Sequence, residues 1–164
     1  MIEFQFARQS DLKKIVGTYN ASIPDRLATA DLEAVSVESK QKWFDDHNDA
    51  DRPLWIIFFN EQYAGWMSFS SFYGRPAYSA TVELSIYLEP LFHKNGIGKN
   101  ALEFADVEAK KRKITSLLGF IFGHNNASLK LFQQAGYEKW AHLPEIANME
   151  GALRDLIILG KKIR

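Results

Sequence analysis

The sequence predicts a single α/β domain, residues 1–164, in which helices flank a mixed β-sheet. Strand-like runs and helical runs alternate along the chain, and three strand-like runs follow one another near its middle. The length is ordinary for one domain, and no internal repeat, low-complexity segment or linker divides it. The order is strand, helices, an antiparallel run of strands, helix, strand, helix and strands, which predicts a mixed sheet.

The N-terminal part is expected to form one strand and two helices. Residues 2–8 read as a short strand. Ser10 or Asp11 can cap the helix that follows, and a second helical stretch covers about 37–46. The first helix is marked by apolar side chains at a helical period, which are Leu12, Ile15, Val16 and Tyr19.

Three strands are expected in the middle of the chain. Residues 53–59 form a continuous apolar run, typical of a buried strand, and 60–62 form a turn. Residues 63–72 alternate between apolar and polar side chains, so these two strands are predicted to form a hairpin. After a loop at 73–76, a third and longer strand covers about 78–88.

The C-terminal part is expected to alternate helices and strands. A helix follows Gly98, and residues 116–122 form a buried strand. Asn125 or Asn126 caps the next helix. Two strand-like runs complete the chain at about 137–142 and 155–160.

The composition excludes several classes of function. The chain has no cysteine, so it has no disulfide, thiolate zinc site or cysteine nucleophile. Its 20 basic residues balance its 20 acidic residues, which gives no electrostatic footprint for nucleic acid or an anionic membrane. With no signal-peptide pattern and no stretch long and apolar enough to span a bilayer, the expected location is cytoplasmic. No metal is expected either, because no ligand spacing relates His47, His93, His124 and His142.

The stretch "HKNGIGKN" at 93–100 is the most informative loop. A hairpin turn at Asn95 and Gly96 would be followed by strand alternation, but the apolar positions after it follow a helical period. A Walker loop requires Ser or Thr in place of Asn100, and a dinucleotide loop requires a preceding parallel strand. The remaining interpretations are an ordinary loop and a glycine turn at a helix N-terminus, whose unpaired N–H groups and dipole suit a phosphate or diphosphate.

The strand before this loop carries Glu83 in its middle. The glutamate shares a polar face with Thr81, Ser85 and Tyr87, while apolar side chains occupy the other face. One interpretation is the solvated face of a sheet. The other is a general base, because the strand is expected to be central and to lead to the anion-binding turn. Partial burial there would raise the pKa of the carboxyl group, which suits proton transfer.

Several motifs together resemble those of the GNAT superfamily of acetyl-coenzyme A-dependent N-acetyltransferases. A strand leads into a two-glycine turn and a helix, and "NNASLKLFQQAGY" follows the next strand. Closer similarity to the phosphinothricin and methionine sulfoximine N-acetyltransferase group lies in "YN" at 19–20, "RPAYSATVELSIYL" at 75–88 and "RDLIILG" at 154–160. This resemblance covers nearly the whole chain. It implies a mostly antiparallel mixed sheet with a splayed central strand pair, acetyl-CoA as cofactor, a small-molecule amine as substrate, and a homodimer.

The resemblance implies which residues contact the cofactor. Backbone amides of the glycine turn hold the diphosphate, the splayed strand pairs with the pantetheine arm, and two polar residues of the following helix region add contacts. His93 stands where the family usually has Gln or Arg, and Lys94 where glycine is common, but backbone amides still do the holding. The implied cofactor-binding residues are Ile86, Tyr87, Leu88, His93, Lys94, Asn95, Gly96, Ile97, Gly98, Lys99, Asn125 and Ser128.

The resemblance also implies catalytic and substrate-binding residues. Glu83 corresponds to the general base, acting directly or through water. Arg75 and Tyr78 correspond to substrate contacts, the alternative for Arg75 being a surface arginine. Phe132 departs from the family, which places tyrosine or histidine there to protonate the leaving thiolate. Tyr87, another group or solvent then supplies that proton, or the step needs no dedicated acid.

Three functions are consistent with these observations. The leading hypothesis is transfer of an acetyl group to the amino group of a small amino acid or analogue, such as phosphinothricin, methionine sulfoximine or methionine sulfone. Transfer occurs directly within a ternary complex, since no cysteine is present to carry an acyl group. The alternatives are an N-acetyltransferase for proteins or peptides, and a non-catalytic module that binds acyl-CoA.

Overall fold

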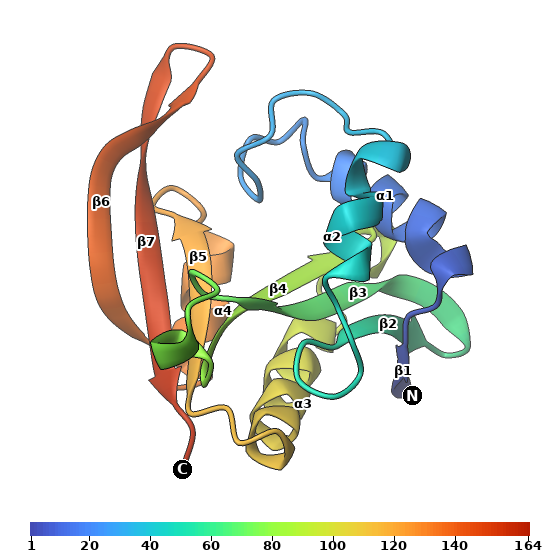
Figure 1. Ribbon diagram of the computed structural model, residues 1–164. Coiled ribbons are helices and arrows are strands. Elements are labelled where there is room, and N and C mark those ends of the chain that lie inside the picture. Colours follow the sequence, from blue (N-terminus) through green and yellow to red (C-terminus); the bar gives the residue numbers. More distant parts are fainter.

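The computed structural model describes residues 1–164 and contains one seven-stranded sheet (Figure 1). The strands are β1 (Ile2–Phe6), β2 (Leu54–Phe59), β3 (Gln62–Ser71), β4 (Thr81–Leu88), β5 (Ser116–Phe122), β6 (Glu138–Met149) and β7 (Ala152–Lys162). The α-helices are α1 (Leu12–Ala21), α2 (Gln41–Asp45), α3 (Ile97–Lys111) and α4 (Asn126–Gln134). The strand order is β1-β2-β3-β4-β5-β7-β6, with only β4 and β5 parallel. The predicted mixed α/β sheet is therefore confirmed, with β4 at its centre.

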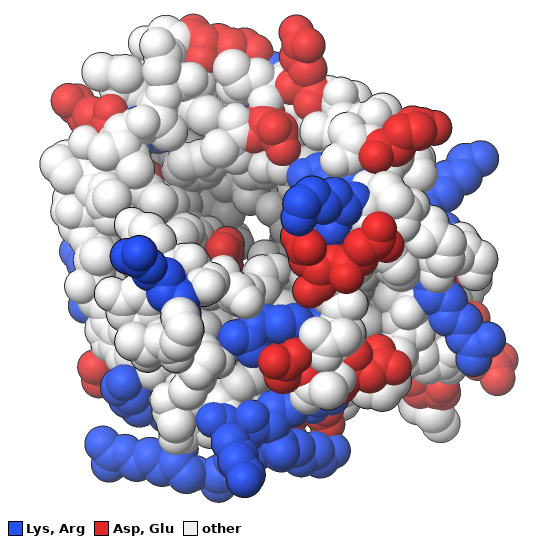
Figure 2. All heavy atoms as spheres, viewed as in Figure 1, with Lys and Arg blue, Asp and Glu red and all other residues white.

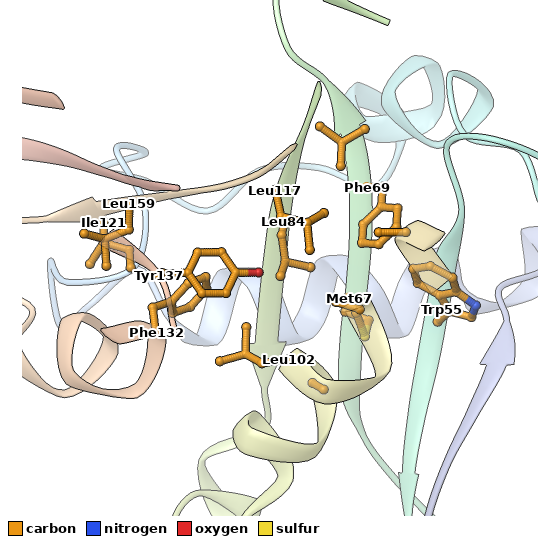
Figure 3. Packing of buried hydrophobic residues seen from close by; sticks show 14 of the residues in the cluster. Trp55, Met67, Phe69, Leu84, Leu102, Leu117, Ile121, Phe132, Tyr137 and Leu159 are labelled. Atoms are coloured by element: carbon orange, nitrogen blue, oxygen red, sulfur yellow. The ribbon is translucent and has the colours of Figure 1, made fainter. Parts of the chain in front are cut away.

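The two faces of the sheet bury different clusters. Val82 and Leu84 of β4 lie in the larger cluster of 19 buried residues, which α3 and Phe132 of α4 complete (Figure 3). The other face is covered by α1 and α2, where Trp66 packs with Ile15 in a smaller cluster and donates its indole N–H to the Ile15 carbonyl, 3.1 Å away. Because side chains alternate along a strand, Glu83 faces the α1 and α2 side.

The central strands β4 and β5 separate along their length. Their register pairs only Thr81 to Glu83 with Ser116 to Leu118, although the strands contain 8 and 7 residues. Beyond Glu83, β4 keeps β3 as its only strand neighbour. The main-chain groups of β4 that face β5 are therefore available to a ligand, and the predicted splayed strand pair is confirmed.

The C-terminal hairpin is much longer than its sequence indicates. The predicted strands at 137–142 and 155–160 are extended to the full lengths of β6 and β7, which form the long hairpin at the left of Figure 1. Residues 144–151 show no regular alternation of apolar and polar side chains, and most of them are exposed. Backbone pairing across the hairpin, with a register shift between Leu143 and Ala147, maintains the strands there.

Several predicted boundaries were wrong by a few residues. The strand expected at 78–88 begins at Thr81, because Pro76–Tyr78 form a 3-10 turn that starts at proline. The first strand ends at Phe6 rather than at residue 8, and a second 3-10 turn, Gln9–Asp11, follows it.

Two predicted helix starts also change. Neither Ser10 nor Asp11 caps α1 with its side chain, because the Asp11 carboxylate accepts the N–H of Arg8 instead. The helix expected after Gly98 begins at Ile97. The stretch expected at 37–46 divides into a 3-10 turn (Glu38–Lys40) and α2. No helix of the structure has the length and apolar character needed to cross a membrane.

Gly65 marks the closest approach of β3 to β4, and its replacement is expected to destabilise the fold. Its φ is +154°, and an added Cβ would lie 2.1 Å from the carbonyl oxygen of Tyr87. We expect Gly65→Ala to lower the free energy of unfolding by about 3 kcal/mol, because the obstructing atom belongs to the backbone and cannot rotate away. Urea denaturation measures this.

The matched control is Gly17→Ala in α1. This glycine is exposed, and an added Cβ would meet no atom within 4 Å. Alanine is the better helix former, so we expect a gain in stability of about 0.5–1 kcal/mol. Equal effects of the two substitutions would contradict the close approach of β3 to β4.

Candidate active site

The glycine turn after β4 folds into an open helix start. Gly96 is the N-cap residue of α3 and adopts a left-handed conformation (φ 76°, ψ 5°), and Lys94 also has a positive φ of 64°. The side-chain amide of Asn95 donates to the carbonyls of Phe92 and His93, both 3.1 Å away. These contacts bend the turn so that the chain enters the helix with its first amides directed outward.

The amides of this turn have no acceptor within the protein. The backbone N–H groups from Lys94 to Lys99 make no hydrogen bond to a backbone or side-chain group, and the main-chain bonds resume at Asn100, which donates to Gly96. The turn is exposed apart from the buried Ile97 side chain. Free amides and the positive end of a 15-residue helix are the features that bind phosphate groups.

A cavity of about 550 Å³ lies where β4 and β5 separate. Its walls come from β4, β5 and α4, from the segment at 27–30 between α1 and α2, and from the end of β6 at 146–149. Glu83 is the only charged residue among those that line it. Figure 2 shows this face hollowed, with red acidic atoms visible inside largely white walls.

Glu83 presents a partly buried carboxylate to the cavity. Burial raises the pKa of its carboxyl group above the ordinary value of 4.5. No hydrogen bond from the protein reaches this carboxylate, so its oxygens are free to meet a ligand in the cavity. The predicted location of Glu83 in a partly buried crevice is confirmed by this geometry.

Two tyrosines fasten the 27–30 segment over the cavity. The Tyr87 hydroxyl donates to the carbonyl of Ala28 at 3.1 Å, and burial raises its pKa well above the ordinary value. Tyr19 hydrogen-bonds both Thr29 and Asp31, and its pKa is raised to about 12, first by burial and then by the Asp31 contact. Both hydroxyls therefore stay protonated at neutral pH.

Asn125 links the same segment to α4. Its side-chain oxygen accepts the N–H of Ser128 at 3.2 Å, which confirms it as the helix cap, and its amide donates to the carbonyl of Leu27 at 3.3 Å. Asn125 and Ser128 both line the cavity, together with Phe132. The capping and bridging bonds already use both polar atoms of Asn125.

The structure brings some of the sequence-predicted residues together and leaves others apart. Glu83, Ile86, Tyr87, Asn125 and Ser128 share the cavity. The turn at 93–99 and Leu88 lie outside its lining and are joined to each other, because the His93 side chain donates to the Leu88 carbonyl at 3.1 Å.

Arg75 and Tyr78 lie elsewhere. They line a separate hollow of about 210 Å³ with Arg52 and the end of β3, and none of its residues lines the larger cavity. Within one chain, Arg75 and Tyr78 therefore do not share a cavity with Glu83.

Sequence reasoning missed two walls of the cavity. Residues 27–30 and 146–149 carry no motif, and they reach the site only because the fold closes over it. No group of three or more His, Cys, Asp or Glu side chains in the structure is arranged to hold a metal ion.

Comparison with known proteins identifies the family. The model of the acetyltransferase (GNAT) family matches residues 15–137. YwnH of Bacillus subtilis (strain 168), named a phosphinothricin acetyltransferase, is 42% identical over 160 residues, which cover 97% of this chain and 98% of that protein. The L-amino acid N-acyltransferase MnaT of Escherichia coli (strain K12) is 26% identical over 158 residues, covering 96% and 92%.

Solved structures agree with the sequence matches. A crystal structure described as a phosphinothricin N-acetyltransferase superposes with a TM-score of 0.95 at 41% identity and covers 100% of this chain and 99% of its own. The Sinorhizobium meliloti phosphinothricin acetyltransferase, solved with AcCoA, has the same fold, with a TM-score of 0.91 at 23% identity and coverage of 99% and 88%. By sequence and by fold, the chain belongs to the acetyltransferase (GNAT) family of enzymes.

Proposed function

We propose that the protein transfers the acetyl group of acetyl-CoA to the amino group of a small amino acid or analogue, of the phosphinothricin, methionine sulfoximine or methionine sulfone type. The main support is Glu83, a carboxylate with a raised pKa that is the only charge in an otherwise uncharged cavity. The names of YwnH and of the Salmonella typhimurium L-methionine sulfoximine/L-methionine sulfone acetyltransferase, 23% identical, support the substrate class. Residues 1–164 act as one catalytic domain in this proposal.

The cofactor is held mainly by the main chain. The free amides from Lys94 to Lys99 bind the diphosphate, and the lysine charges add attraction. Main-chain groups of Ile86 to Leu88, unpaired on the β5 side, receive the pantetheine arm. Ser128 lies at the cavity wall, whereas Asn125 contributes by holding Leu27 and the start of α4. The chemistry that acetyl-CoA supplies is an activated acyl group on a good leaving thiol.

The residues of the chain promote direct attack by the amine. An α-amino group has a pKa of about 8, so most of it is protonated at pH 7 and cannot attack. Glu83 accepts the proton, since its carboxylate is unoccupied and its raised pKa makes it a better base. Backbone N–H groups of β4 stabilise the oxyanion as it forms. Both reactants are held together in the cavity, which removes much of the entropic barrier.

Tyr87 is the proposed proton donor for the leaving thiolate, because Phe132 at the cavity wall cannot serve. Its hydroxyl is protonated at neutral pH, and Tyr87 lines the cavity on the same strand and the same face as Glu83. We expect Tyr87→Phe to lower kcat about tenfold with KM for acetyl-CoA unchanged, since a thiolate leaves moderately well unaided. Steady-state kinetics measures this; an unchanged kcat would assign the proton to solvent.

The walls of the cavity favour a small acceptor over a protein. Tyr19 and Tyr87 hold the 27–30 segment over the site, so the acceptor enters a cavity of about 550 Å³ that is walled on several sides. Amino acids and their sulfone, sulfoximine and phosphinate analogues should be screened for thiol release from acetyl-CoA. We expect stimulation by at least one of them and none by peptides. Release with peptides alone would establish the protein-directed alternative, and CoA binding without release would establish the non-catalytic one.

We also infer that the protein is a homodimer in the cytoplasm. Arg75 and Tyr78 are exposed, and the hollow that they line opens at the surface of the chain. In a dimer, they are therefore accessible for contact with an acceptor carboxylate. Light scattering in solution measures the mass of the particle. The mass of a single chain of 18.8 kDa would contradict the dimer.

A further inference from the structure

The proposed reaction releases a proton that must leave Glu83. A protonated amine and an acetyl thioester give an amide, a thiol and one free proton. The carboxylate takes that proton from the ammonium group, the freed amine forms the C–N bond, and the C–S bond breaks as the thiolate takes the second proton. While the cavity is filled by both reactants, a protonated Glu83 is cut off from bulk water on that side.

Ser70 lies beside Glu83 on the neighbouring strand. The two residues are directly opposed in the antiparallel register of β3 and β4, so their side chains share one face of the sheet. Opposed residues place their Cβ atoms about 4.5–5.5 Å apart. No direct hydrogen bond joins the two groups, so contact between the carboxylate and the hydroxyl requires a bridging water molecule.

His47 lies on the far side of Ser70, just after α2. Its Nδ1 is 2.8 Å from the carbonyl oxygen of Trp43, and its Nε2 is 3.2 Å from the Ser70 hydroxyl. A carbonyl only accepts, so Nδ1 carries the hydrogen and Nε2 of the neutral ring is an acceptor. The Ser70 hydroxyl therefore donates to His47, and its lone pairs remain free on the side of Glu83.

Packing holds the imidazole in this orientation. The Trp43 ring contacts His47 edge-on, with centroids 4.7 Å apart, and itself packs on Trp66 of β3 at 5.3 Å. In Figure 1, α2 lies on the opposite side of the sheet from α3, above the face that carries Glu83. Neither His47 nor Ser70 lines the cavity, so the contacts lead away from the site where reactants bind.

We propose that Ser70 and His47 form a proton relay that carries the proton released in the reaction from Glu83 to solvent. The inference rests on the proposed role of Glu83. Protonated Glu83 gives its proton through a water molecule to Ser70 Oγ, and Ser70 passes its own hydroxyl proton to His47 Nε2. The imidazolium keeps its Nδ1–H bond to Trp43. The Ser70 hydroxyl then rotates back toward Glu83, so that a water molecule replaces it at Nε2 and takes the Nε2 proton, which returns all groups to their starting states.

The charges around His47 suit this role. Burial lowers its pKa below 6.5, so the ring is neutral and ready to accept a proton at pH 7, while the Trp43 carbonyl and the Asp46 carboxylate oppose that lowering. Asp46 is itself paired with Lys42 on the same segment, and Glu83 is the titratable group that faces the relay from β4. The ring therefore binds a proton only briefly and releases it readily.

The test uses substitutions along the relay in the full chain. With acetyl-CoA and the best acceptor from the screen, both saturating, we expect His47→Gln and Ser70→Ala to lower kcat about tenfold with both KM values unchanged. Added imidazole buffer should restore the rate of His47→Gln, and Ser70→Thr, which keeps the hydroxyl, should retain activity. Ser68→Ala is the matched control, on the same strand and face, and should behave as the wild type.

The outcomes separate the relay from the proposed function. An unchanged kcat in His47→Gln, or a loss that imidazole does not restore, would overturn the relay. Equal losses in Ser70→Ala and Ser70→Thr would do the same, because the hydroxyl would then not matter. If Glu83→Gln is also fully active, the assignment of the base has failed; if Glu83→Gln is inactive while His47→Gln is normal, only the relay has failed.

Discussion

Glu83→Gln is expected to reduce kcat by about 10²–10⁴-fold, because the amide keeps the shape of the side chain but cannot accept the proton of the amine. KM for acetyl-CoA should stay unchanged, since the amides of the turn at 93–99 do not contact position 83. Steady-state thiol release measures both constants. Glu138→Gln, at an exposed position of β6, is the control.

The same substitution is expected to stabilise the fold at neutral pH. Burial raises the pKa of Glu83 in the folded protein, so the folded state binds this proton more tightly than the unfolded chain does. Stability therefore falls as pH rises from the ordinary pKa of 4.5 through the raised one, and the full penalty is present above the raised pKa.

Thermal melts of wild type and variant test this opposition of activity and stability. We expect Glu83→Gln to melt higher than the wild type at pH 7, and the difference to vanish below pH 4.5, where Glu83 is protonated in both states. A variant that melts lower at pH 7 would show that the surroundings stabilise the carboxylate. That result would contradict the description of Glu83 as a buried carboxylate without a hydrogen-bond partner.

Gly96→Val is expected to weaken acetyl-CoA binding about tenfold or more. The residue occupies the left-handed region at the N-cap of α3, which costs a residue with a Cβ about 1–2 kcal/mol, and valine is among the least tolerant. The turn would adopt another conformation, and the amides from Lys94 to Lys99 would no longer point at one diphosphate. Calorimetric titration with CoA measures the affinity.

Gly151→Val supplies the matched control for this prediction. Gly151, at the tip of the β6–β7 hairpin, also has a positive φ of 93°, and an added Cβ there would meet no atom within 4 Å, as at Gly96. The two substitutions therefore cause similar local strain at different places. Loss of CoA affinity in both variants would indicate general destabilisation, and loss in neither would contradict the role of the turn.

The sequence predicted best the elements whose signals are local. The alternation of 81–88 correctly separates a buried face from the face of Glu83, and Asn125 is the cap of α4 as its position indicates. It predicted least well the outer half of the β6–β7 hairpin, where main-chain pairing rather than apolar alternation maintains the strands. The separation of β4 and β5 was predicted through the family resemblance, since periodicity carries no information about distance between strands.

The residues of the candidate site also divide into those that local sequence signals predicted and those that only the folded structure revealed. The residues on β4 and the turn at 93–99 were found because the residue types themselves carry the chemistry: a carboxylate in a strand and glycines at a helix start. The walls at 27–30 and 146–149 and the contact of His47 with Ser70 could not be found, because they join segments far apart in the chain. The loop of Arg75 was predicted to contact the substrate, and in the structure it lines a separate hollow.

By itself, the order of residues determined the order of the strands and helices, the cap of α4 by Asn125 and the presence of one glutamate on a polar strand face, since each depends on neighbours within a few positions. Only the tertiary structure decided that this glutamate is the only charged residue lining the cavity, and that its pKa is raised. Burial is the physical reason: the loss of solvent around Glu83 comes from segments that reach it only after the sheet has formed.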